Sequence, residues 1–306
     1  MIPINQKNCN KAIQNLGVPD CILQNGRITG FIATSPDWSI NLTSGTFDLT
    51  TVNELIQEGT FIPILGSVET VNGTPEATTE EYQGGIMSVV RQGLPMFTFK
   101  FIKGWAFSRA LYTMNSFQQY KLLLVFEDGS IAGAVDGDIF SGYTLGMLNT
   151  GTFMHTDGAT SGYSNTVVQM TNSDEYSTDS AVLTRETNGF NANNLLPITD
   201  IVMIGRADVS ENKIYFKPKF RMNEASVLNG LAIANLRVTV DGVLDTITPA
   251  SLVYDSVNGE YSFEPTTAVT LLQSWVVQLY DTTNVIDVTK VGNRYYKGAT
   301  PSFVGN

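Results

Sequence analysis

The feature that most constrains this chain is the alternation of apolar and polar residues across positions 236–280. Apolar side chains occupy every second position in residues 236–240 and again in residues 275–279. Asp-Gly at 241–242 and Asn-Gly at 258–259 separate such runs, and both dipeptides are strong signals for tight hairpin turns. A period of two is typical of strands with one buried face. The stretch therefore predicts a small β-sandwich, a module that usually binds or displays something and seldom catalyses.

The length of 306 residues predicts about two domains, each large enough to bury its own core. An Asn-rich segment, residues 187–197, ends in a proline and is typical of a boundary. We therefore expect a β domain over residues 1–190 and an immunoglobulin-like sandwich over residues 191–306. Residues 201–204 and 213–220 are expected to be strands that precede the sandwich.

The first domain is expected to be a β-sandwich or barrel with one or two flanking helices. Thr51 and Glu54 form a capping box that predicts the start of a short helix, which Gly59 would close. A second helix is expected after Gly104, with Phe107, Ala110, Leu111 and Met114 facing a sheet. Strands are predicted at residues 27–33, 61–65 (an edge strand because of its proline) and 96–102, with a hairpin over residues 121–135.

Residues 66–85 form a polar, acidic stretch with few large apolar side chains. A polar excursion of this length is unusual inside a compact domain and is often functional. We expect it to be a long loop or a protruding hairpin. Its candidate functional residues are Val71, Asn72, Thr74, Pro75, Glu76, Thr79, Glu80 and Glu81.

The charge composition of the chain limits the kinds of partner that it can bind. Charged residues make up 15% of the chain, well below the roughly 25% of an ordinary soluble domain. The formal net charge of −11 argues against tight binding of nucleic-acid phosphates and against binding to anionic membranes.

The N-terminus lacks a basic region followed by an apolar core, so no secretion signal is expected. Cys9 and Cys21 could form a disulfide or remain free thiols, and free thiols fit a reducing compartment.

Motifs for catalysis or cofactor binding are weak. The single histidine, His155, lacks a recognisable nucleophile and orienting group, and is expected to lie in a loop. Acidic residues around Asp128-Gly129 and at Asp136 and Asp138 fit hairpin turns better than a calcium loop. No metal site, cofactor or enzymatic activity is predicted. Tyr295 and Tyr296 are expected to be exposed.

The order of these elements resembles that of bacteriophage tail tube proteins. The resemblance is carried by residues 27–33, the excursion 66–85, the strand 96–102 with the helix after Gly104, and the sandwich 236–288. It implies a virion protein assembled in the bacterial cytoplasm into hexameric rings that stack as a tube. It also implies that the excursion, with the candidate residues named above, contacts the next ring or subunit. Its partners would be copies of itself and other virion proteins, with DNA passing through without tight binding.

Two other functions remain open. The chain could be another phage component, such as a ring, decoration or fibre protein, whose C-terminal sandwich binds host glycans. It could also be a glycan hydrolase, because a catalytic carboxylate pair is defined by spatial separation and not by sequence.

Overall fold

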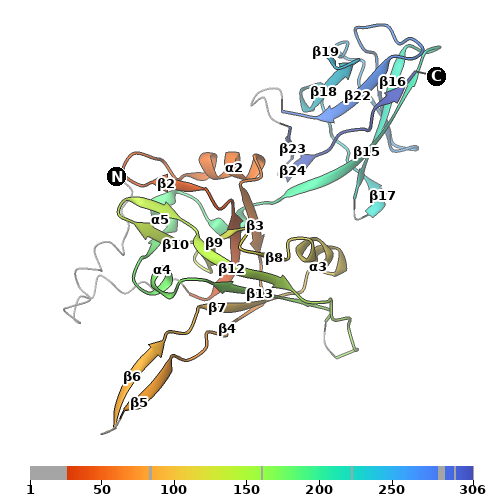
Figure 1. Cartoon of the computed structure of the whole chain (residues 1–306). Helices are drawn as coiled ribbons and strands as arrows, with labels where there is room; N and C mark the ends of the chain where they lie inside the picture. The colour runs from red at the N-terminus through yellow and green to blue at the C-terminus, as the bar shows by residue number, and fades with distance from the viewer. Residues whose placement is uncertain are drawn as a thin grey trace. The chain divides into compact units, whose positions relative to one another are not determined.

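The computed structural model describes residues 26–82, 85–159, 161–221, 223–281, 287–292 and 294–305. Cys9 and Cys21 lie outside these residues. The chain divides into two compact units, Met1–Leu195 and Leu196–Asn306, and strands predominate in both (Figure 1). The predicted mainly β fold with few helices is therefore confirmed. Within the described residues, no helix has the length and apolar character needed to cross a membrane.

The first unit is built from two runs of paired strands. Its elements are β1 (Ile28–Thr34), β2 (Ser39–Asn41), α2 (Leu49–Gln57), β3 (Phe61–Leu65), β4 (Glu69–Asn72), β5 (Thr78–Tyr82), β6 (Ile86–Arg91), β7 (Met96–Phe101), α3 (Trp105–Tyr112), β8 (Ser116–Phe117), β9 (Lys121–Phe126), β10 (Ile131–Asp136), β11 (Ile139–Ser141), β12 (Tyr143–Thr150), β13 (Ser164–Met170), α4 (Ser173–Ser177), β14 (Ser180–Leu183), α5 (Arg185–Asn188) and η2 (Ala192–Asn194). One run has the order β3-β1-β9-β10-β14, and the other has the order β4-β7-β13-β12-β8. Among the described strands, β3 pairs with β1 alone, as expected for a strand that contains proline.

The core of this unit lies between the two runs. In β7 every second side chain is buried, and the ring of Phe99 lies 4.9 Å from that of Phe31 in β1. Strand β1 is buried on both faces, since Ile32 is as inaccessible as Phe31. A strand covered on both sides needs apolar residues at consecutive positions, which explains why β1 and β9 do not alternate.

Helix α2 begins three residues earlier than the capping box predicted. Asp48 is the N-cap, and its carboxylate accepts a hydrogen bond from the Thr51 amide at 2.9 Å. This hydrogen bond to the charged form lowers the pKa of Asp48. The prediction at Thr51 was wrong because the carboxylate upstream already satisfies the amide of Thr51. Gly59 follows the helix with φ of +80°, as expected for a left-handed C-terminal residue.

Helix α3 packs with a slightly different face from the predicted one. Ser108 and Leu111 are buried, whereas Ala110 is exposed. The ring of Phe107 lies 5.4 Å from that of Phe101, and this contact fixes the rotation of the helix against β7.

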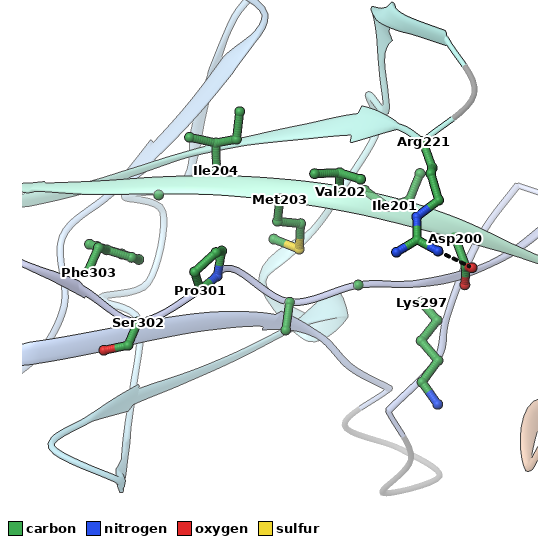
Figure 2. A pocket seen from close by; sticks show the side chains of 13 residues that line it. Asp200, Ile201, Val202, Met203, Ile204, Arg221, Lys297, Pro301, Ser302 and Phe303 are labelled. Atoms are coloured by element: carbon green, nitrogen blue, oxygen red, sulfur yellow. Dashed lines mark ion pairs between the residues drawn. The ribbon is translucent and has the colours of Figure 1, made fainter.

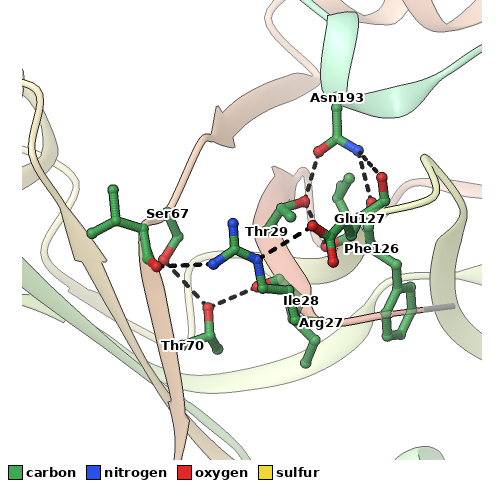
Figure 3. Close-up of polar contacts among 10 residues, drawn as sticks. Arg27, Ile28, Thr29, Ser67, Thr70, Phe126, Glu127 and Asn193 are labelled. Atoms are coloured by element: carbon green, nitrogen blue, oxygen red, sulfur yellow. Dashed lines mark hydrogen bonds and ion pairs between the residues drawn. The ribbon is translucent and has the colours of Figure 1, made fainter.

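A polar network fixes β4 to the body of the unit (Figure 3). The Thr70 hydroxyl in β4 donates to the Ile28 carbonyl at 2.8 Å. On the next residue of β1, the Thr29 hydroxyl donates to the side-chain oxygen of Asn193 at 2.6 Å. The Asn193 amide in turn donates to the carbonyl of Phe126, at the end of β9, at 2.7 Å. The Thr70 bond thus fixes β4, which lies within the predicted excursion 66–85, to β1, and the Asn193 bonds join β1 to the end of β9.

The second unit is a sandwich with the immunoglobulin strand order. Its elements are β15 (Ile198–Asp208), β16 (Lys213–Phe220), β17 (Asn223–Val227), η3 (Ile233–Asn235), β18 (Leu236–Val240), β19 (Val243–Asp245), β20 (Val253–Asp255), β21 (Glu260–Phe263), β22 (Ser274–Leu279), β23 (Thr289–Val291), β24 (Arg294–Lys297) and β25 (Phe303–Val304). One sheet contains β20-β21-β16-β15, and the other is β19-β18-β22-β25. This order corresponds to that of the two immunoglobulin sheets. The strands β15 and β16, expected to precede the sandwich, are part of its first sheet.

Side chains that alternate along these strands meet in one core. Trp275 is fully buried, and the rings of Phe216 and Tyr261 stack 5.1 Å apart. Tyr295 and Tyr296 are buried rather than exposed, so that prediction was wrong. Both tyrosines lie in β24, which has β15 on one side and β23 on the other. Tyr296 is buried because its side chain packs into the core of the unit, with its ring 6.1 Å from that of Phe220, and the Lys290 ammonium lies 5.8 Å from the centre of the Tyr295 ring.

Candidate functional site

The candidate site is a projecting hairpin in the first unit, which we call the hairpin arm (residues 73–82 and 85–95 of the described chain). Its two legs are held together at the base. The Gly73 amide donates to the Met96 carbonyl at 2.8 Å, and the Met96 amide donates to the Thr74 hydroxyl at 3.1 Å. Gly93 lies so close to Pro75 that a Cβ at position 93 would be 1.8 Å from the Pro75 carbonyl oxygen. The arm therefore leaves the body from a fixed base that accepts only glycine at this position.

Beyond this base the arm extends away from the body of the unit (Figure 1). Strands β5 and β6 pair only with each other among the described strands. Met87 is 66% exposed and Val90 is 60% exposed, and Val89 and Tyr82 are also exposed. A two-stranded hairpin is marginally stable in water, and a group of exposed apolar side chains typically marks an interaction surface.

The register of the arm separates its side chains into two faces. Thr79 is opposite Val89, and Glu81 is opposite Met87. Residues directly opposite each other in an antiparallel pair share a face. We call the face formed by these four residues the Met87 face. Glu80 and its partner Ser88 lie on the other face.

The arm is acidic as well as apolar. Glu76, Glu80 and Glu81 are exposed, and none of them has an ion-pair partner among the described residues. An edge or hairpin surface that combines large apolar groups with unpaired carboxylates fits a partner that is apolar and basic.

The predicted contact residues fall into two groups, and all eight are exposed. Val71 and Asn72 belong to β4 and pair with β7, so they lie on the sheet edge and not on the arm. The remaining six lie on the arm: Thr74, Pro75, Glu76, Thr79, Glu80 and Glu81.

The predicted excursion also ended too early. The arm continues to residue 95, and β6 carries most of its large apolar side chains. Gly84-Gly85, followed by a β-branched, apolar run, is a hairpin signal that would have identified β6 from the sequence.

A second candidate site is a cleft in the immunoglobulin-like unit (Figure 2). It has a volume of about 620 Å³ and lies between β15 and the segment 297–303. The cleft opens because β24 pairs with β15 only at residues 198–200, after which the chain crosses to pair with β22. Asp200 and Arg221 form an ion pair of 3.6 Å at one end, near Lys297, and Phe303 lies at the other end.

The residues considered for catalysis are dispersed. His155 is exposed, and its ring lies 5.1 Å from that of Phe153. Asp128 accepts hydrogen bonds from the amide and the hydroxyl of Ser130 within the β9–β10 turn. Asp136 is exposed at the end of β10. Across the described ranges, His, Cys, Asp and Glu side chains nowhere gather in a group of three that could hold a metal ion.

A scan against protein-family models gave no match, and a search of curated proteins also gave none. The hairpin arm and the architecture of the two units are therefore the observations from which function is inferred.

Proposed function

We propose that this chain is a structural subunit that assembles with copies of itself, and specifically a phage tail tube protein. Its rings would stack into a hollow tube that lets DNA pass. The observation that carries this proposal is the hairpin arm, which projects apolar side chains into solvent from a glycine-locked base. An arm of this kind gains stability only when another surface covers it.

Open sheet edges support the same function. Strand β4 ends its run of strands, and Val68 and Val71 beside its free edge are exposed. Natural proteins usually protect such edges with charge, bulges or covering elements. Pairing with a neighbouring subunit would cover this edge in a ring.

The charge of the chain fits passage of DNA. A subunit with a net charge of −11 that lines a channel would repel phosphates rather than retain them. Assembled tubes should therefore not bind double-stranded DNA at low salt, and a strong salt-dependent affinity would oppose the tube proposal.

Negative-stain electron microscopy of a truncated arm tests the proposal. We would replace residues 76–92 with Asn-Gly, because Pro75 and Gly93 are in contact and a two-residue turn can join the legs. The wild-type protein should form rings or tubes at raised concentration. The truncated protein should keep its circular dichroism spectrum and thermal transition but form neither.

A matched substitution controls for the loss of exposed apolar surface in general. Val257 is 91% exposed in the β20–β21 turn, so Val257→Thr should leave assembly unchanged. Normal tubes from the truncated protein would show that the arm is not the assembly element.

The alternative function is adhesion, as in a ring, decoration or fibre protein that binds host glycans. The cleft of the immunoglobulin-like unit favours it, because an ion pair, a lysine and an aromatic ring border one hollow. A discrete protein that binds bacterial surfaces, and loses this binding on Lys297→Ala, would favour adhesion over tube formation.

A further inference from the structure

The outer face of α3 has the composition of an interface. Trp105, Arg109 and Tyr112 follow each other at spacings of four and three residues, which places them on one side of the helix. Trp105 is 62% exposed and Tyr112 is 57% exposed, while Ser108 and Leu111 of the same helix are buried. We call Trp105, Arg109 and Tyr112 the α3 face. These three residue types are those most enriched among the energetically dominant residues of protein interfaces.

The α3 face also carries a positive charge that has no ion-pair partner in the described part of the chain. No carboxylate among the described residues forms an ion pair with Arg109. Strand β8 begins four residues after the helix, and both α3 and β8 lie beside β12. Phe117 in β8 is 72% exposed. An exposed cation among large aromatic groups fits an occupant that is both apolar and acidic.

The charges of the first unit are segregated along the chain in a way that supplies such an occupant. Residues 28–90 contain no Lys or Arg, and residues 82–126 contain no Asp or Glu. The first stretch carries eight carboxylates: Asp37, Asp48, Glu54, Glu58, Glu69, Glu76, Glu80 and Glu81. The second carries five cations: Arg91, Lys100, Lys103, Arg109 and Lys121. The acidic strand of the hairpin arm and the α3 face thus have opposite charge.

The arm cannot reach the α3 face of its own chain. The arm leaves the body at the Met96 end of β7, whereas α3 follows the Phe101 end. Six strand residues separate these ends by roughly 20 Å, and the arm points away from the body. An acceptor for the arm must therefore lie on another molecule.

We propose that the α3 face of one copy receives the Met87 face of the hairpin arm of a second copy, with Glu81 opposite Arg109. This inference rests on the proposed function, because it takes the arm to be the assembly element. Met87 and Val89 would cover Trp105 and Tyr112. The contact joins two different surfaces, so repetition produces a closed ring or an open filament.

Adjacent glutamates on opposite faces of the arm provide a sharp test. Glu81→Lys places a cation against Arg109, whereas Glu80→Lys makes the same change of charge on the other face. Glu81→Lys and Arg109→Glu should each raise the concentration needed for assembly by roughly tenfold or more, as expected for a close interfacial charge pair. Glu80→Lys should have little effect. Equal effects of the two lysine substitutions would overturn the proposed pairing.

Mixing the two charge-reversed proteins separates this inference from general damage. An equimolar mixture of Glu81→Lys and Arg109→Glu chains can alternate, since each contact then joins opposite charges. The mixture should assemble although neither protein does so alone. The α3 proposal alone would be overturned if the wild type assembles but the mixture does not. It would also be overturned if both single variants assemble as well as the wild type. A wild type that never assembles would overturn the proposed function as well.

Tryptophan fluorescence gives an independent readout. Trp105 is the exposed one of the three tryptophans, whereas Trp275 is fully buried and Trp38 is partly buried. Assembly should therefore shift the emission to shorter wavelength in the wild type but not in Trp105→Phe. An unchanged wild-type spectrum in the assembled protein would contradict burial of the α3 face.

Discussion

Gly93 determines how the hairpin arm leaves the body of the first unit. It lies so close to the Pro75 carbonyl that any side chain at position 93 would clash with it. The hydrogen bonds that join Gly73 and Thr74 to Met96 lie beside this contact. The sequence shows a glycine here, but it cannot show the close approach, because Pro75 lies 18 positions earlier in the chain.

Substitution of Gly93 should weaken assembly without unfolding the protein. In Gly93→Ala the methyl group must displace Pro75, so the legs of the arm separate and the Met87 face is no longer held in place. We expect roughly tenfold weaker assembly and faster tryptic cleavage after Arg91, the only basic residue of the arm. Gly151→Ala is the control, since its nearest neighbour would be 3.9 Å away. Equal effects of the two substitutions would refute this role for Gly93.

The strands and helices differ in how well the sequence predicts them. Alternation identified β7, β18, β21 and β22 because each has one buried face. The arm was only partly predicted, because no core dictates a pattern in strands that are exposed on both faces. The start of α2 was misplaced for a local reason, since Asp48 and Thr51 are both good caps and only the fold decides between them.

The arm should behave as an element that becomes ordered in contact with a partner. Among the described strands β5 and β6 pair only with each other, and no core lies beneath them, so the amides of the arm should exchange rapidly in the separate subunit. Assembly should slow exchange in β5 and β6 by roughly tenfold or more, while the buried strands β1 and β9 stay protected in both states. Hydrogen exchange measured by mass spectrometry before and after assembly tests this, and an arm with unchanged exchange in the assembled protein would argue against it.

At the scale of the molecule, the period of the apolar residues and the turn dipeptides were enough to predict a mainly β chain with an immunoglobulin-like C-terminal module. They placed β15 and β16 outside the sandwich because sequence order does not reveal that β16 pairs with β21 and that β15 pairs with β16. The low content of charged residues and the opposite charges of residues 28–90 and 82–126 are the sequence features that support the proposed packing against copies of the same chain.

Sedimentation velocity of the purified chain over a range of concentrations tests self-assembly most directly. The wild-type protein should move from a single-subunit boundary to large, fast-sedimenting species as concentration rises, whereas the protein lacking residues 76–92 should sediment as one subunit throughout. A wild-type chain that sediments as a single subunit at every concentration would contradict the account.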